Sequence, residues 1–434
     1  MLKRIAVIGT GIAGNAAAWA LATGSPHDVT VYEREARPGG HCGTVDVDYD
    51  GVTIPVDTGF MVYNDLNYPN LAALFAHLGV ATRPASMSFS VSVEDGSFEW
   101  AGDSERRLSA FFAQKRNLVS LRHFRMLGDI VRFNRRAVAD LAAGRLGGLS
   151  LGDYLDREGY SPRFRDDYLL AMGAAIWSTS PAKMLGFPAE SFVAFCENHR
   201  LIHWTRPQWR TVEGGSRAYV ETLVAPLRPR TRFGCPAALV RRLPGGVEVV
   251  DAQGQRDRFD AVLIATHSDE ALALLEDPTP QERAVLGRIP YAPNEICLHR
   301  DPALMPRRRA AWSSWNLLKE RDTSEAAAIT YWMNRLQGID PARPVFVSLN
   351  PHKPPRADLV FGRFTYRHPQ YDQAAIRAQG ALPAIQGVGG TWFCGAWTRY
   401  GFHEDGLVSG LAAAEALGAA VPWRVAERRF AQAA

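Results

Sequence analysis

The sequence has few cysteines and no long apolar run. Its five cysteines are odd in number, widely spaced and contain no CxxC pair, which is typical of a reducing compartment rather than of a disulfide or zinc framework. No apolar run reaches the roughly 18 residues of a transmembrane helix. Residues 1–4 lead directly into a strand-like stretch and leave no room for a signal peptide. We therefore expect a cytoplasmic protein, with any membrane contact peripheral at the inner membrane.

A strong charge of one sign is also absent. The 49 basic and 45 acidic residues give a formal net charge of +4, too little for a nucleic-acid footprint over the whole molecule. Hydrophobic residues make up 47% of the 434 positions, which excludes disorder, collagen and coiled coil and allows a large core. This length predicts two or three structural units, which the chain can weave from separate pieces.

The first forty residues predict a βαβ unit. A buried strand at 5–8 precedes the turn Gly9-Thr10-Gly11-Ile12-Ala13-Gly14, which opens an alanine-rich helix to about residue 22. A second strand at 29–32 ends at Glu33. A GxGxxG pattern alone is weak, but in this context, with an acidic residue after the second strand, it predicts a dinucleotide site.

Each residue type in the turn has a physical reason. Gly9 allows the tight turn, Gly11 lets backbone amides approach a pyrophosphate, and Gly14 lets the helix lie close to the strand. Glu33 would accept hydrogen bonds from a ribose, and its charge disfavours a 2′-phosphate. FAD or NAD is therefore favoured over NADP.

Later segments alternate between two kinds of pattern. Apolar periodicity predicts a helix over 69–79, and alternation predicts a β-hairpin over 87–100. Strands are predicted near 239–240, 247–250 and 261–266, and a strand at 391–396 precedes a small-residue helix at 406–417. The segment 281–384 is rich in aromatic residues and suits further strands of a second domain with an apolar pocket.

Four arginines form a stripe on one predicted helix, opposite its apolar face: Arg122, Arg125, Arg132 and Arg136. The stripe could steer an anionic substrate or rest on anionic lipid headgroups. It could equally be an ordinary solvated helix face.

The assembled motifs resemble the flavin-dependent amine oxidase superfamily, which includes monoamine and polyamine oxidases, protoporphyrinogen oxidase and carotenoid desaturases. The resemblance spans nearly the whole chain. Its anchors are the 9–14 turn, Glu33, Arg37 to Thr44, Asp57-Thr58-Gly59, Gly214-Gly215, Val240, and Phe393-Cys394-Gly395 through Gly406 with its helix. His41 stands where the family usually has arginine, and Ala396 where it often has aspartate.

The resemblance implies FAD as the cofactor. It places the pyrophosphate at Gly9, Gly11 and Gly14, the ribose at Glu33, the ribityl or pyrophosphate region at Gly39 and Gly40, the adenine at Val240, and the flavin end at Gly395 and Gly406. The expected cofactor-binding set is completed by Ile12, Ala13, Arg34, His41, Thr58, Gly59, Asp405 and Leu407.

More narrowly, the chain is similar to a bacterial branch of these flavoproteins that is associated with cyclopropane or methyl-branched fatty acid metabolism. The stretches that carry this likeness include Gly39-Gly40-His41, Asp57 to Phe60, Tyr331 to Gln337 and Gly401 to Leu407. This likeness implies an acyl-chain substrate.

A flavin accepts a hydride from a C–H bond, and desaturation also requires a base for the second hydrogen. His403, Glu404 and Tyr400 are the catalytic candidates, although Glu404 or Asp405 could instead cap the helix that follows. A strand over 331–334 would put Tyr331 and Met333 on one face, and these two residues with Phe402 form the predicted substrate pocket. Aromatic residues at this spacing are also common in cores.

The sequence thus predicts an α/β fold: a discontinuous Rossmann-like FAD-binding domain (1–80, 208–280, 385–425) and a mixed sheet-plus-helix substrate domain (81–207, 281–384), with a tail at 426–434. The expected activity is desaturation or oxidation of a fatty-acyl chain by hydride transfer to FAD. Amine oxidation, carotenoid-type desaturation and a non-catalytic partner of a lipid-modifying enzyme stay open as alternatives.

Overall fold

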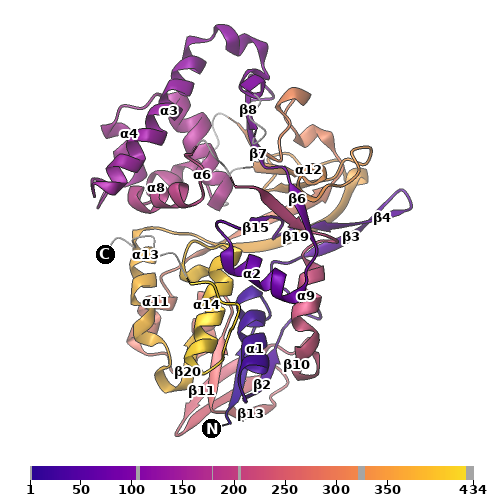
Figure 1. Cartoon of the computed structure of the whole chain (residues 1–434), viewed down its shortest axis with the longest axis vertical. Coiled ribbons are helices and arrows are strands. Elements are labelled where there is room, and N and C mark those ends of the chain that lie inside the picture. Colours follow the sequence, from indigo (N-terminus) through magenta and orange to yellow (C-terminus); the bar gives the residue numbers. More distant parts are fainter. Residues whose placement is uncertain (1, 104–107, 178, 204–206, 321–327, 427–434) are drawn as a thin grey trace.

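The computed structural model of the chain describes residues 2–103, 108–177, 179–203, 207–320 and 328–426. It has the predicted mixed α/β architecture, with a parallel sheet at one end of the molecule and a larger mixed sheet with a helical cap at the other (Figure 1). No helix within the described ranges is both long enough and apolar enough to cross a membrane.

The parallel sheet, sheet A, has the strand order β10-β2-β1-β14-β20. Its strands are β1 (Arg4–Ile8), β2 (Asp28–Tyr32), β10 (Thr231–Arg232), β14 (Ala261–Ile264) and β20 (Thr391–Phe393). Every residue of β14 is buried, because helices or further strands cover both faces of the sheet. All strands run parallel, so their carboxyl ends meet at one edge.

Two helices pack against each other beside sheet A, α1 (Ile12–Gly24) and α14 (His403–Ala416) (Figure 1). A Cβ on Gly410 would lie 2.1 Å from the carbonyl oxygen of Ala13, and one on Gly14 would lie 1.9 Å from that of Gly9. Both positions therefore exclude any side chain, and the close approach predicted for Gly14 is confirmed.

The predicted helix after residue 68 is α2 (Pro69–Leu78), which ends at Gly79 with a φ of 67°. Sheet A is flanked by α9 (Arg217–Val224), α10 (Ser268–Leu274), α11 (Pro280–Leu286) and α13 (Gln373–Ala381), and by the antiparallel sheet β11 (Ala237–Leu243), β12 (Gly246–Asp251) and β13 (Arg256–Phe259). Two small sheets consist of β3 (Thr44–Tyr49) with β4 (Val52–Asp57), and of β5 (Tyr63–Asn64), β9 (Trp209–Val212) and β6 (Thr82–Ala85).

The mixed sheet, sheet D, has the order β19-β15-β18-β17-β16-β7-β8. Its strands are β7 (Ser88–Val93), β8 (Phe98–Asp103), β15 (Tyr291–His299), β16 (Trp315–Lys319), β17 (Ala328–Trp332), β18 (Phe346–Leu349) and β19 (Val360–Pro369). The predicted hairpin is β7 and β8, with Val93 opposite Phe98. The predicted strand over 331–334 is wrong, because β17 ends at Trp332 and α12 (Met333–Gln337) begins there.

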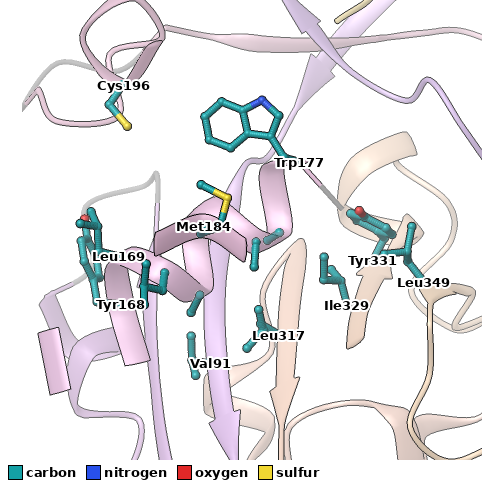
Figure 2. Close-up of a cluster of buried hydrophobic side chains, with 14 of the residues drawn as sticks. Val91, Tyr168, Leu169, Trp177, Met184, Cys196, Leu317, Ile329, Tyr331 and Leu349 are labelled. Atoms are coloured by element: carbon teal, nitrogen blue, oxygen red, sulfur yellow. The ribbon is translucent and has the colours of Figure 1, made fainter. Parts of the chain in front are cut away.

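Helices cover one face of sheet D: α3 (Leu121–Ala142), α4 (Leu151–Arg157), α5 (Pro162–Phe164), α6 (Leu170–Trp177), α7 (Pro181–Leu185) and α8 (Ala189–Asn198). Figure 2 shows the core between them, where Trp177 and Met184 lie over side chains of sheet D strands such as Leu317 and Ile329. Leu317, Ile329 and Met184 are each at most 1% exposed. The predicted stripe of arginines lies on α3, whose inner face includes the buried Met126 and Phe133.

Candidate active site

One cavity of 1410 Å³ begins at the carboxyl ends of the sheet A strands and extends beneath the helices that cover sheet D. A crevice at this edge of a parallel sheet is the usual ligand site of doubly wound folds. We call two parts of its lining the cofactor end and the apolar end. The cofactor end comprises Gly9, Gly11, Ile12, Ala13, Glu33, Arg34, Gly39, Gly40, His41, Thr58, Gly59, Ala237, Ala238, Thr266, His267, His368 and Gly395. The apolar end comprises Met87, Phe89, Trp100, Phe111, Phe112, Leu127, Ile130, Val131, Met172, Ala175, Ile176, Trp315, Tyr331, Leu349 and Phe364.

The glycine turn presents an open helix terminus to the cofactor end. Gly11 is the N-cap of α1 and offers no side-chain cap, and a Cβ placed on it would meet nothing within 4 Å. The next two residues, Ile12 and Ala13, also line the cavity. Free backbone amides at a helix N-terminus attract anions, so this opening fits the pyrophosphate of a dinucleotide.

A second glycine loop lies against this turn. Gly39 and Gly40 have φ values of 114° and 54°, which residues with a side chain rarely adopt. The backbone N–H of Gly39 donates to the carbonyl of Thr10 at 2.9 Å. A Cβ on Gly40 would lie 3.1 Å from the Cα of Gly11, so the two loops together form one cradle.

Glu33 is buried at the end of β2 and retains hydrogen-bonding capacity. One carboxylate oxygen accepts from the backbone N–H of Thr10 at 2.8 Å and from its hydroxyl, and the other accepts from the N–H of Glu35 at 2.9 Å. A carboxylate offers about four acceptor positions, so one is left for a ribose hydroxyl. Arg34 lines the same region and pairs with Glu270 at 2.9 Å.

His41, the departure from the family pattern, lies among other imidazoles. Its ring centroid is 5.9 Å from that of His267 and 5.5 Å from that of His368. Burial lowers the pKa of His41 to about 3 and that of His368 to about 4. The Nε2 atom of His41 is buried without a hydrogen-bond partner among the described residues. A cofactor in this cradle would supply the missing partner.

Thr58 and Gly59 support the histidine loop. The Thr58 hydroxyl donates to the carbonyl of Gly43 at 2.8 Å, and a Cβ on Gly59 would lie 2.0 Å from the carbonyl oxygen of His41. Both residues line the cavity. The acceptor position on Glu33, the glycine cradle and the unpartnered His41 nitrogen therefore fit FAD, and Glu33 and Gly395 are among the residues that would hold it.

The prediction that Val240 contacts the adenine is wrong, and residues two and three positions earlier in β11 line the cavity instead. Val240 is fully buried in a core cluster with Tyr32 and Phe259, whereas Ala237 and Ala238 line the cavity. The ladder between β11 and β12 shifts between Ala237 and Leu239, and a bulge of this kind reorients the side chains beyond it.

The terminal segment is also only partly at the cavity. Gly395 lines it, with a φ of 153° and a Cβ position only 2.6 Å from the Trp397 ring. Asp405, Gly406 and Leu407 do not line it, so their predicted cofactor contacts are corrected. The carboxylate of Asp405 accepts from the N–H of Phe402 at 2.9 Å and caps α14.

Gly406 and Leu407 have packing roles instead. A Cβ on Gly406 would lie 2.8 Å from the Ile12 side chain, and Leu407 is fully buried in the core around α1. Gly14 likewise packs without lining the cavity. These residues hold α14 against α1, and among the residues of these two helices the cavity lining includes Ile12, Ala13 and His403.

Of the three predicted catalytic residues, only His403 lines the cavity. Its Nε2 lies 2.5 Å from the Tyr219 hydroxyl and 3.6 Å from the Cys42 sulfur, and its ring stacks on Phe60 at 3.9 Å. Burial lowers the pKa of His403 to about 3. What excludes His403 as a base for the substrate is the contact of its Nε2 with the Tyr219 hydroxyl, which leaves that nitrogen unavailable to a substrate.

Glu404 and Tyr400 are corrected. Both oxygens of Glu404 accept hydrogen bonds from the start of α2, at 2.9 Å from the N–H of Asn70 and 2.9 Å from that of Leu71. This acid therefore caps a neighbouring helix that has no side-chain cap of its own. Tyr400 packs on Phe195 with a centroid distance of 5.7 Å and does not line the cavity.

The apolar end collects side chains from β7, β8, β16, β17, β18 and β19 and from α3 and α6. Tyr331 belongs to it, and Figure 2 shows this side chain next to Leu349. Phe402 lines the cavity and packs against both the core around α1 and the core of sheet D, so we place the junction of the two ends there. Met333 is fully buried outside the cavity, so its predicted pocket role is wrong. The three carboxylates of the lining, Glu33, Glu35 and Glu270, all lie on the cofactor side.

His199 lines the cavity beside Phe402 and was not predicted. Its Nδ1 donates to the carbonyl of Phe195 at 3.1 Å, which leaves Nε2 as the acceptor nitrogen of the neutral ring. The ring stacks on Phe195 at 3.9 Å and lies 5.4 Å from Phe402. Burial lowers the pKa of His199 to about 4. A lone histidine after a helix has no local signal that distinguishes it from a core residue.

Polar groups gather where a second cavity of 310 Å³ shares Val131, Asn134 and His203 with the first. Glu197 accepts from His203 at 2.7 Å, and an Arg200 nitrogen lies 3.2 Å from the other His203 nitrogen. Arg200 has a φ of 54° and pairs with no carboxylate among the described residues. We call this group the polar mouth.

Comparisons with known proteins agree with this architecture. The family model described as flavin containing amine oxidoreductase matches residues 12–300. No curated protein sequence matches the chain.

Several solved structures share the fold over nearly their whole length. A wild-type putrescine oxidase bound to putrescine is 14% identical with a TM-score of 0.67, covering 96% of this chain and 99% of its own. Cyclohexylamine oxidase from Brevibacterium oxydans IH-35A is 19% identical with a TM-score of 0.65 and the same coverage. The CLA-producing fatty acid isomerase from P. acnes is 15% identical with a TM-score of 0.65, covering 96% and 98%.

Proposed function

Because the chain belongs to the family of flavin containing amine oxidoreductases, we propose that this FAD-dependent oxidoreductase removes hydride from a long apolar substrate, most specifically a fatty-acyl chain. FAD is its cofactor, and the residues of the cofactor end described above would hold it. The substrate class is the part of this statement that the apolar end supports.

The single observation that carries the proposal is the contrast in lining between the two ends. The apolar end is formed by aliphatic and aromatic side chains, without a carboxylate or a lysine among the described lining residues. An ammonium group moved into such surroundings would lose its hydration without gaining a counter-charge, which is costly. A hydrocarbon chain gains roughly 0.8 kcal/mol for each buried CH₂ group.

Bound FAD supplies a two-electron acceptor that takes a hydride from a C–H bond. The residues at the junction of the two ends then have two tasks. Phe402 and Phe195, whose rings stack at 5.1 Å, keep water away from the reacting carbon. Desaturation also releases a proton from the neighbouring carbon, and this proton needs an acceptor within reach.

His199 is the residue best placed to accept that proton. Its Nε2 is an unprotonated acceptor, and its ring borders Phe402 at the junction. A low pKa does not exclude this role, because a carbon next to a developing positive charge gives up its proton to a weak base. In the reductive half-reaction His199 would take the proton, FAD held at the cofactor end would accept the hydride, and the substrate would keep a new carbon–carbon double bond. Oxygen or another electron acceptor would then reoxidise the flavin.

The polar mouth suits an anionic group at the far end of the chain. Among the described residues that line the first cavity, Arg200 contributes the one guanidinium away from the cofactor end, and it pairs with no carboxylate of the described residues. The Asn134 side-chain oxygen is buried nearby without a partner. A fatty-acid carboxylate could pair with Arg200 while the chain extends towards Phe402.

Product analysis tests the proposal. The FAD-loaded protein is incubated with fatty acids of graded length and with alkylamines of matching length, and the products are examined by mass spectrometry. Loss of two hydrogens from the acyl chain supports the proposal. Aldehyde formed from the amines, with the acids unchanged, would show an amine oxidase instead, and this second candidate is favoured by the aromatic rings at the junction.

A further inference from the structure

Exposed apolar side chains are concentrated at one place on the molecule. Leu118, Val119, Leu121 and Phe124 are 55%, 85%, 87% and 47% exposed, and they belong to the 3₁₀ turn η2 (Lys115–Val119) and the start of α3. Only five other large apolar side chains of the described residues are comparably exposed, and they are scattered. We call these four residues the apolar tip.

The apolar tip is surrounded by positive charge. Lys115, Arg116, Arg122 and Arg125 are exposed, and none of them forms an ion pair among the described residues. The sequence from 108 to 128 contains no aspartate or glutamate. By contrast, Arg132 pairs with Asp129 at 2.9 Å and Arg136 pairs with Glu158. Two of the four arginines of the predicted stripe thus have acidic partners, and the two arginines without one lie next to the apolar tip.

The same segment forms part of the substrate cavity. Phe111 and Phe112, which precede the tip, and Leu127 and Ile130 on the inner face of α3 all line the apolar end. Figure 1 shows α3 in the helical cap, at the end of the molecule opposite the N-terminus. A ligand that partitions into a bilayer would therefore meet the cavity wall directly behind the tip.

We propose that the apolar tip and its four basic residues dock this protein onto a membrane that contains anionic phospholipid. Apolar side chains enter the interface while Lys115, Arg116, Arg122 and Arg125 lie among the headgroup phosphates. A second copy of the chain is a poorer occupant, because a two-fold contact would bring two sets of unpaired cations together. The docking does not depend on the proposed activity, since it requires only this surface.

Vesicle cosedimentation of the FAD-loaded full chain tests the proposal. We expect binding to mixed phosphatidylcholine and phosphatidylglycerol vesicles, little binding to phosphatidylcholine alone, and release at high salt. The double variant Arg122→Glu with Arg125→Glu should bind at least about 25-fold more weakly. The double variant Val119→Ser with Leu121→Ser should bind about tenfold more weakly through lost apolar burial.

Two controls each carry one substitution of the same kind elsewhere on the surface, Arg288→Glu and Val388→Ser, and should bind like the wild type. All the changed side chains are exposed, so the bound-flavin spectrum should be unaltered. Equal binding by tip and control variants would overturn the proposal. So would a dimer in sedimentation velocity that the Val119→Ser with Leu121→Ser variant abolishes, because the tip would then be a self-association surface.

Discussion

The two ends of the cavity are constructed differently. The cofactor end is made largely of backbone, with glycines at positive φ, helix N-terminal amides and short loops such as 9–14 and 39–40. The apolar end is made of side chains from eight separate strands and helices, together with Met87, Phe111 and Phe112 from the segments between them. A polar, extended cofactor requires fixed backbone donors, whereas a hydrocarbon requires only shape and the absence of charge.

This contrast predicts that a substitution at one end of the cavity affects the binding of one ligand only. The largest effect is expected at Gly11. Gly11→Asp introduces no clash, because a Cβ there meets nothing within 4 Å. A carboxylate about 4 Å from a phosphate costs about 4 kcal/mol at an effective dielectric of 20. We expect FAD affinity to fall about 1000-fold, measured by fluorescence titration of the apoprotein.

Gly380→Asp is the matched control, since this helical glycine also has open space around it. It should leave FAD affinity unchanged. Equal losses in both variants would mean that Gly11 does not face the pyrophosphate.

The junction is tested at His199. His199→Gln should slow the reduction of bound flavin by the acyl substrate about 100-fold, the low end of the range for loss of a general base. FAD affinity should not change, because the residue lies beyond the cofactor end. Stopped-flow absorbance measures the rate, and dithionite reduction at the wild-type rate would show that the flavin itself is intact.

A substitution in the polar mouth should have a smaller effect, on KM rather than on the rate of flavin reduction. Arg200→Gln should raise KM for a free fatty acid about tenfold, the value of a partly exposed charge-assisted hydrogen bond, and leave kcat nearly unchanged. The corresponding methyl ester should bind equally well to both proteins. An equal rise in KM for the ester would indicate a packing role for Arg200 rather than recognition of a carboxylate.

The smallest effect concerns stability away from the cavity, at His299 in β15. Burial lowers the pKa of this buried histidine to about 4. Its stabilising contribution is therefore present above the ordinary histidine pKa of about 6.5 and is lost as the pH falls towards 4. Relative to His299→Gln, the wild type should lose up to about 1.4 kcal/mol of unfolding free energy per pH unit in that window, measured by urea denaturation.

Burial raises the pKa of Asp405 to about 7, which acts in the opposite direction, because the folded state then binds a proton more tightly than the unfolded state. Asp405 is present in both the wild type and His299→Gln, so its contribution cancels when the unfolding free energies of the two proteins are subtracted. A difference that does not vary with pH would contradict the neutral state assigned to His299.

The same contrast explains what could be predicted from the sequence. The 9–14 turn and the Gly39-Gly40 loop are short contiguous segments whose function depends on backbone conformation. Their glycine patterns are therefore sufficient to predict their roles from the sequence. The predicted contact of Val240 with the adenine was wrong, because a bulge in β11 directs the Val240 side chain into the core. The predicted catalytic role of Glu404 was wrong, because its carboxylate caps α2, a helix that is distant in the sequence. His199 could not be found, because its position depends on packing between α8 and the segment before α14.

The most direct test of the account is anaerobic titration of the FAD-loaded wild-type protein, followed by the visible absorbance of the flavin. We expect long-chain acyl lipids to bleach the flavin and polar diamines such as putrescine to leave its absorbance unchanged. Bleaching by the diamine with no response to any acyl lipid would contradict the claim that the apolar end receives a hydrocarbon chain.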